Sequence, residues 1–168
     1  MEQNKKGNLA MKPALVIIDL QEVFLRERKH TSTYQSILGH INYALDIFHQ
    51  ADLPVIIIRD VYGEDGEDFK CVAELDLHEG DLHMTKSHFN AFYQSPLETL
   101  LSDLDVQSIV LAGMTAEYCI DATYFGGKDR GFNVCLLQGG VFASQEQALT
   151  LSYYTRDWVS CSALKSFI

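Results

Sequence analysis

The stretch Ala14-Leu-Val-Ile-Ile-Asp-Leu-Gln21 decides the fold. Its first five residues form a continuous apolar run, which is typical of a β-strand that is covered on both faces in a parallel sheet. A second such run, Pro54-Val-Ile-Ile-Ile58, comes after residues 31–50, whose apolar side chains recur at helical spacing. Because parallel neighbours need a crossover connection, this strand–helix–strand order predicts a parallel sheet.

The same alternation continues to the end of the chain. Further strands are expected at residues 82–85, 108–112, 134–137 and 158–163, and further helices at residues 96–104, 118–130 and 144–156. Residues 61–79 are acidic and irregular, so we expect a surface loop or flap there. The pattern predicts a doubly wound, mostly parallel six-stranded sheet with helices on both sides, which is a three-layer α/β/α sandwich.

Length and composition indicate one globular domain. The chain has 168 residues, of which 47% are hydrophobic and 21% charged, so it is long enough to bury a core and is not of disordered composition. Residues 1–12 are polar, contain three lysines and lack the apolar core of a secretion signal. We expect them to form a flexible tail, and residues 13–168 to form the single domain.

Charge and cysteine usage narrow the class of protein. A formal net charge of −10 is opposite to the basic footprint of nucleic-acid binders and disfavours anionic membranes. No apolar run approaches the roughly 18 residues of a membrane span. The four cysteines are far apart and form no CxxC pair, which suits a reducing compartment. We therefore expect a cytoplasmic protein whose ligand is a small molecule.

Three reactive side chains follow the ends of expected strands. Asp19 ends the first strand, Lys86 ends the third, and Cys119 lies just past the fourth, at the start of an expected helix. Sites in open parallel sheets form beyond the carboxyl ends of the strands, so we expect the three to share one pocket. A helix N-terminus favours a thiolate, and a carboxylate beside a thiol can accept its proton.

Each of these residues also has a structural interpretation. Asp19 alone is equally well explained as a cap at the strand end, and Lys86 alone as a solvated surface lysine. Cys119 alone reads as a small buried hydrophobic residue, as we expect Cys135 and Cys161 to be. The joint placement at strand ends is what favours a site.

Three segments together resemble the isochorismatase-like hydrolases, and they occur in the same order: Ala14-Leu-Val-Ile-Ile-Asp-Leu-Gln21, Thr85-Lys-Ser-His-Phe-Asn-Ala-Phe-Tyr93 and Leu111-Ala-Gly-Met-Thr-Ala-Glu-Tyr-Cys-Ile-Asp-Ala-Thr123. The resemblance runs from about residue 13 to the last strand. It implies a triad with Asp19 as acid and base, Lys86 as charged partner and Cys119 as nucleophile. It also implies a cis peptide bond between Met114 and Thr115, with the oxyanion held by the backbone N–H groups of Thr115 and Cys119.

The chain departs from the family pattern at several positions. Ala116 stands where threonine is frequent, and Gly139-Gly140, expected after the fifth strand, stands where Asp-Ala is common. Nicotinamidases of the family bind a divalent metal through an aspartate and histidines after the second strand, whereas residues 59–68 here contain no histidine. We read this acidic stretch as a solvated loop and expect neither a metal nor another cofactor.

Gln21 and several aromatic residues are candidates for the pocket wall. Gln21 either binds substrate or braces Asp19. The aromatic candidates are Phe24, Tyr62, Phe89, Phe92, Tyr93 and Tyr118, together with His88, and among them we expect substrate contacts from Phe24, Tyr62, Phe92 and Tyr118. Relatives of this type usually assemble, so we also expect a homo-oligomer.

The leading hypothesis is a metal-independent cysteine hydrolase that cleaves a C–N bond of a small amide, carbamoyl or ureido compound through a thioester. Two alternatives stay open. Ala116 and Gly139-Gly140 give weight to a non-catalytic scaffold or binding protein. The other alternative is isochorismate-type vinyl ether hydrolysis, against which Cys119 argues, because family members with that chemistry lack the cysteine. The residues do not identify the substrate.

Overall fold

The computed structural model describes residues 11–61 and 69–168. The strands are β1 (Pro13–Ile18), β2 (Val55–Asp60), β3 (Leu82–Lys86), β4 (Ser108–Gly113), β5 (Asn133–Val141) and β6 (Trp158–Val159). The α-helices are α1 (Glu22–Leu25), α2 (Ser32–Gln50), α3 (Leu97–Asp103), α4 (Asp121–Asp129), α5 (Glu146–Thr155) and α6 (Cys161–Phe167). A 3-10 turn, Arg26–Arg28, follows α1, and a π-helical turn, Ala116–Ile120, precedes α4.

All six strands pair in parallel, in the order β3-β2-β1-β4-β5-β6. The chain starts in the middle of the sheet, winds out to β3, returns to β4 beside β1 and winds out to β6. This confirms the predicted doubly wound α/β sandwich. The direction of winding reverses between β1 and β4, and such a switch point is where open α/β sheets form their ligand crevice.

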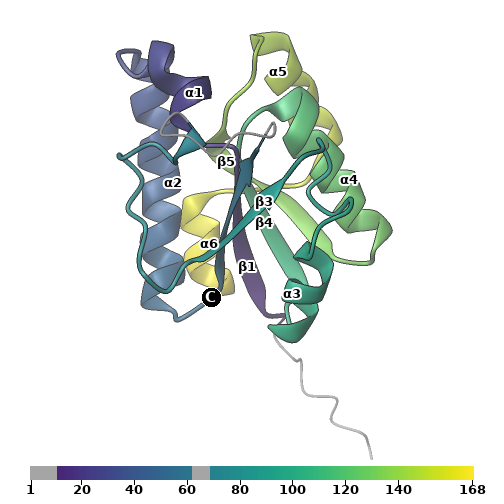
Figure 1. Ribbon diagram of the computed structural model, residues 1–168. Helices are drawn as coiled ribbons and strands as arrows, with labels where there is room; N and C mark the ends of the chain where they lie inside the picture. Colours follow the sequence, from purple (N-terminus) through teal and green to yellow (C-terminus); the bar gives the residue numbers. More distant parts are fainter. Residues whose placement is uncertain (1–10, 62–68) are drawn as a thin grey trace, which may run out of the picture.

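Helices cover both faces of the sheet. Figure 1 shows α1, α2 and α6 on one side and α3, α4 and α5 on the other. Alternate residues of β1 point to opposite faces, so Leu15 and Ile17 join the core under α2, and Val16 and Ile18 join the core under α3 and α4. Each fully buried aliphatic side chain of this kind stabilises the fold by about 1.5–3 kcal/mol. Burial on both faces explains the continuous apolar run.

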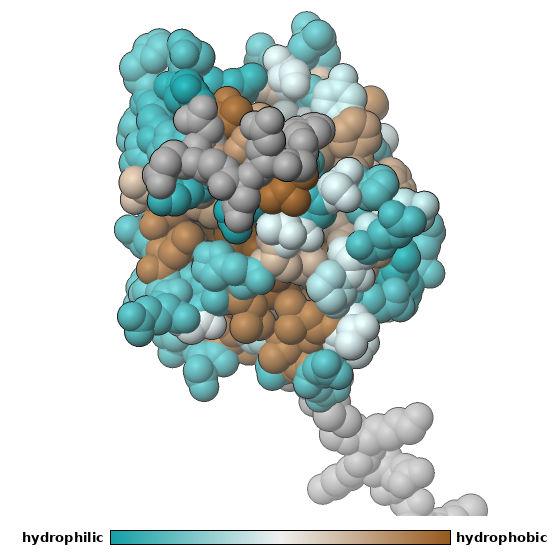
Figure 2. All heavy atoms as spheres, viewed as in Figure 1, coloured by the Kyte–Doolittle hydropathy of each residue, from teal (hydrophilic) through white to brown (hydrophobic). Residues whose placement is uncertain are grey.

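The outer surface follows from this layering. Figure 2 shows hydrophilic residues over the outer helices, and hydrophobic residues gathered around β3 and α3, at the free edge of the sheet. No helix among the described residues is long and apolar enough to cross a membrane.

The two ends of the chain differ from the sequence expectation. Of the tail expected over residues 1–12, residues 1–10 lie outside the described part. Lys12 is tied to the sheet, because its backbone carbonyl accepts hydrogen bonds from the N–H groups of Gln107 and Ser108. The strand expected at residues 158–163 has only two residues, since the Ser160 side chain accepts a hydrogen bond from the Ala163 N–H and caps α6. Cys161 therefore begins a helix.

The glycine pair expected after the fifth strand lies inside β5. The register shifts there, so that Leu136 pairs with Leu111 but Val141 pairs with Gly113. Gly139 has a φ of 77°, a left-handed conformation that glycine adopts without steric penalty. The resulting bulge lengthens β5 and brings Phe142 to the loop that follows β4.

Candidate active site

Asp19 directly follows β1 and lies in a tight turn. Its φ is 58°, which aspartate tolerates better than most residues. Its N–H donates to the Ile58 carbonyl at 2.9 Å, and its carbonyl accepts from the Gln21 N–H at 2.9 Å. Beside it, a Cβ on Gly113 would lie 2.0 Å from the Ile18 carbonyl oxygen, so only glycine permits this approach of β1 and β4. The loop after β4 consequently lies next to Asp19.

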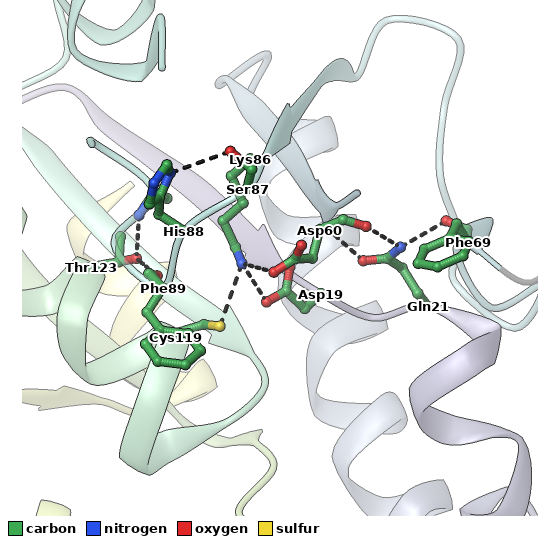
Figure 3. A network of polar contacts seen from close by, with 11 residues as sticks. Asp19, Gln21, Asp60, Phe69, Lys86, Ser87, His88, Phe89, Cys119 and Thr123 are labelled. Carbon is green, nitrogen blue, oxygen red and sulfur yellow. Dashed lines mark hydrogen bonds and ion pairs between the residues drawn. The ribbon is translucent and has the colours of Figure 1, made fainter. Parts of the chain in front are cut away.

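Lys86, the last residue of β3, is the centre of the site (Figure 3). Its Nζ lies 2.8 Å from Oδ2 of Asp19, 2.9 Å from Oδ2 of Asp60 and 3.4 Å from Sγ of Cys119. All four residues are buried, with exposed fractions of 3%, 3% and 3% for Asp19, Asp60 and Lys86 and 8% for Cys119. The three residues proposed as a triad therefore share one buried cluster, because β1, β3 and β4 are parallel and have their carboxyl ends at the same edge of the sheet.

Asp60 is the member of the cluster that the sequence interpretation missed. We expected it in a solvated acidic loop, but it is the last residue of β2 and is buried. It follows the apolar run of β2 after Arg59, much as Asp19 follows that of β1, and this similar position was the available signal. The acidic residues that come after it obscured that signal.

The Gln21 side chain binds the backbone of Asp60. Its Nε2 donates to the carbonyls of Asp60 and Phe69, both at 2.9 Å, and its Oε1 accepts from the Asp60 N–H at 2.7 Å. The side chain is fully buried, and its partners are backbone groups. The expectation that Gln21 binds substrate or braces Asp19 is therefore corrected: it braces the backbone of Asp60.

The loop after β4 carries Cys119. The Met114–Thr115 peptide bond is cis. The N–H of Ala116 donates to the Phe142 carbonyl at 2.8 Å, and the N–H of Phe142 donates to the Gly113 carbonyl at 2.8 Å. These bonds attach the loop to the end of β5. Cys119 lies within the π-helical turn that leads into α4, and not in the first turn of an α-helix as expected.

Charge balance controls protonation in the cluster. Burial and the adjacent Asp19 carboxylate raise the pKa of Cys119 to about 12, against the opposing effect of Lys86. Burial also raises the pKa of Asp19, although Lys86 opposes it. Burial acts to lower the pKa of Lys86, but its carboxylate partners outweigh this and raise it. One ammonium already faces two carboxylates, so a thiolate would add an uncompensated negative charge. The raised pKa favours a neutral thiol at Cys119 over the resting thiolate expected from the sequence.

A cavity of about 270 Å³ opens onto the cluster. It is lined by Asp19, Phe24, Asp60, Phe89, Met114, Thr115, Tyr118 and Cys119. Phe24 and Tyr118 thus lie in the wall, whereas Tyr62 lies outside the described residues.

Phe92 is not in this wall, and Phe89 is. The Phe92 ring is buried in the core beneath α4 and stacks on Phe132 with ring centroids 5.8 Å apart. The chain after β3 is held against α4 by Thr123, whose hydroxyl accepts from the Ala91 N–H at 3.0 Å and donates to the Phe89 carbonyl at 3.4 Å. This irregular turn directs Phe89 toward the pocket and Phe92 into the core. The expectation that Phe92 contacts substrate is corrected accordingly.

The cluster contains donor atoms that a metal ion could use. Among the described residues, one oxygen each from Asp19 and Asp60 and the sulfur of Cys119 lie within 4.8 Å of one another. The Lys86 ammonium contacts all three side chains, so the positive charge that such donors require is supplied by the protein. A divalent ion bound there would be placed against this ammonium. The donor set therefore suits an ammonium better than a metal.

Comparisons with known proteins agree with this architecture. The isochorismatase domain family matches residues 13–154. A secreted isochorismatase effector of Verticillium dahliae is 25% identical over 134 residues, which cover 76% of this chain and 70% of the relative. A ureidoacrylate amidohydrolase of Klebsiella pneumoniae is 29% identical over 62 residues, which cover 37% of this chain and 26% of that protein. The structure of an N-carbamoylsarcosine amidase from Thermoplasma acidophilum superposes with a TM-score of 0.79 at 21% identity, and the match covers 90% and 97% of the two chains.

Proposed function

The chain belongs to the isochorismatase family of hydrolases. We propose that it is a metal-independent cysteine hydrolase, and that it cleaves a C–N bond of a small amide, carbamoyl or ureido compound. One observation carries the proposal. A buried ammonium, that of Lys86, contacts both the carboxylate of Asp19 and the thiol of Cys119, and these two groups line a pocket of small-molecule size. Nucleophile, base and charged partner are thus within reach of one bound carbonyl group.

Asp19 acts as the base in the first step. The thiol of Cys119 is neutral at rest, so its proton passes to Asp19 as Sγ attacks the carbonyl carbon. The carbonyl oxygen takes up negative charge, for which the backbone N–H groups of Thr115 and Cys119 are the proposed donors. Lys86 stays protonated and offsets the negative charge that the departing proton leaves on sulfur.

Asp19 then acts as the acid. It donates the acquired proton to the leaving nitrogen, the C–N bond breaks, and ammonia or an amine departs. Sγ is left in a thioester, or in a thiocarbamate when the substrate is a ureido compound. The raised pKa of Asp19 suits this step, because a weaker acid holds the proton until a basic nitrogen develops.

Water completes the cycle. Asp19, again ionised, takes a proton from a water molecule that attacks the acyl carbon. The C–S bond breaks, the acid product leaves, and the proton on Asp19 returns to sulfur. Atoms and charges balance without a cofactor.

The amidase chemistry of two relatives supports the choice of a C–N bond. Their names describe an N-carbamoylsarcosine amidase and a ureidoacrylate amidohydrolase. In the sequence, the Gly139-Gly140 pair favours a non-catalytic scaffold. In the structure, the bulge at this pair brings the end of β5 to the loop that carries Cys119, which is compatible with an organised site.

Ammonia release from a panel of small primary amides and ureido compounds tests the proposal. We expect Cys119→Ser to lower the rate on any substrate found by about a thousandfold or more, because the nucleophile is lost. Cys161→Ser is the matched control, since Cys161 lies at the start of α6, outside the pocket lining. A Cys119→Ser protein that releases ammonia at the wild-type rate, or a wild-type protein inert to the whole panel, would contradict the proposal.

Self-association and a cytoplasmic location stay predictions of the sequence. Sedimentation equilibrium tests the first, and a mass of only 18.9 kDa would contradict it.

A further inference from the structure

Asp60 is a second carboxylate of the pocket that the mechanism above does not use. Its Oδ2 accepts from Lys86 at 2.9 Å, while its Oδ1 is buried and has no hydrogen-bond partner among the described residues. Asp60 also lines the cavity. Burying a carboxylate oxygen without a donor is costly, so a free acceptor at a pocket wall indicates a donor that arrives with a ligand.

The charge of the site supports the same conclusion. Asp19 alone would balance the Lys86 ammonium, so Asp60 makes the cluster net negative. No positively charged side chain is present among the described residues that line the cavity. A purely structural partner for Lys86 would not require a second full charge, because a neutral amide could accept the same hydrogen bond.

The rest of the wall is mostly apolar and rich in aromatic rings. Phe89 and Tyr118 lie with ring centroids 5.6 Å apart, and Phe24 also lines the cavity. Aromatic rings of this kind pack against planar, weakly polar groups. The wall therefore complements a planar substituent, while the floor offers two carboxylates that accept hydrogen bonds.

We propose that Asp60 is the specificity-determining residue of this pocket, where its Oδ1 accepts an N–H of the substrate beside the scissile bond and its charge excludes substrates that carry a carboxylate. The substrate class is then an uncharged or cationic primary amide or ureido compound with a planar apolar substituent. The position of the scissile bond rests on the proposed function. The charge selection does not, because it is a property of the pocket around Cys119.

Alkylation of Cys119 measures this selection without a known substrate. Iodoacetamide and iodoacetate are similar in size and differ in charge. Their rates at Cys119 are followed by peptide mass spectrometry and divided by their rates with 2-mercaptoethanol. We expect the neutral reagent to be favoured at least about tenfold in the wild-type protein, because a negative reagent is repelled by the net charge of a poorly solvated site.

Asp60→Asn keeps the size of the side chain and removes its charge. We expect it to lower the iodoacetamide preference at least about threefold. Asp46→Asn is the control for net charge, since Asp46 is an exposed residue of α2 whose partner is Gln50, and it should leave the preference unchanged. An unchanged preference in Asp60→Asn would overturn the proposal.

If Asp60→Asn does not fold, the wild-type protein alone still tests the charge selection at Cys119. Methanethiosulfonates that carry an aminoethyl or a sulfonatoethyl group form a second pair, and the cationic reagent should react faster at Cys119 after the same normalisation. Normalised ratios near one for both pairs would overturn the charge selection. A clear preference in a protein that releases no ammonia would instead overturn the proposed function and leave the charge selection standing.

Discussion

Asp60 and Asp81 are both buried carboxylates beside a nitrogen-bearing side chain, but only Asp81 has both of its oxygens paired. Oδ1 of Asp81 lies 2.7 Å from Nε2 of His49, and its Oδ2 accepts from the His78 backbone N–H at 2.8 Å. In the pocket, Oδ1 of Asp60 and Oδ1 of Asp19 are buried and have no partner among the described residues.

The difference separates a structural carboxylate from a functional one. Asp81 precedes β3, does not line the cavity and has its bonding capacity used within the protein, so it contributes to folding. The pocket carboxylates keep acceptors for a ligand, and the protein tolerates their burial because Lys86 contacts both. Between Asp60 and Asp81, incomplete pairing and not burial distinguishes the carboxylate that lines the cavity.

Removing the shared cation tests this comparison most strongly. Lys86→Met leaves two buried carboxylates without a counter-charge, so we expect the free energy of unfolding to fall by about 3–5 kcal/mol, with loss of hydrolysis. Urea denaturation measures the change. Lys128→Met is the control, since Lys128 pairs with the largely exposed Asp157 and should cost at most about 1 kcal/mol. Equal losses in the two variants would show that the pocket lysine has no special role.

The structural carboxylate should behave differently. Asp81→Ala leaves the His78 N–H and the His49 ring without their acceptor, and we expect a loss of about 1–3 kcal/mol in the free energy of unfolding. The kcat/KM for a substrate should stay within about threefold of wild type, because Asp81 is not in the cavity lining and the partners of its side chain among the described residues, His49 and His78, are not either. A larger change in kcat/KM would place Asp81 among the groups that support the site.

Asp19→Asn should give the smallest change in stability and a large change in rate. The pKa of Asp19 in the folded protein is raised above 3.8, so the folded state holds this proton more tightly than the unfolded state does. Its contribution to stability is present at low pH and is lost as the pH rises through the folded pKa. The asparagine variant does not ionise, so it should gain stability relative to wild type between about pH 4 and pH 7.

Urea denaturation of both proteins at the two pH values measures that gain in stability. We also expect the rate of hydrolysis by Asp19→Asn to fall by about a hundredfold or more, because the base is absent. The acid limb of the wild-type pH profile for kcat/KM should likewise lie above pH 3.8. If Asp19→Asn loses stability relative to wild type as the pH rises over this range, Asp19 is held ionised and the assigned direction of its pKa is wrong.

How far each part could be predicted depends on the range of the interactions involved. β1 and residues 55–58 of β2 are continuous apolar runs, because both of their faces are buried, and such runs are visible in the sequence. The last strand is two residues long and gives way to α6 through the Ser160 cap, a local bond that the apolar pattern does not reveal. The glycine pair was placed outside β5, because a bulge depends on the partner strand.

The sequence by itself determined the alternation of strands and helices, and with it the edge of the sheet where Asp19, Lys86 and Cys119 lie at or just beyond strand ends, because periodicity and the order of elements are properties of the chain. Only the tertiary structure decided that Asp60 joins them, that Gln21 binds the backbone of Asp60, and that Phe89 and not Phe92 lines the cavity. The same holds for the raised pKa of Cys119. Each of these features depends on the distances between segments that are far apart in the chain, and on how deeply those segments bury the groups. Burial and the sum of nearby charges exist only once the strands are side by side.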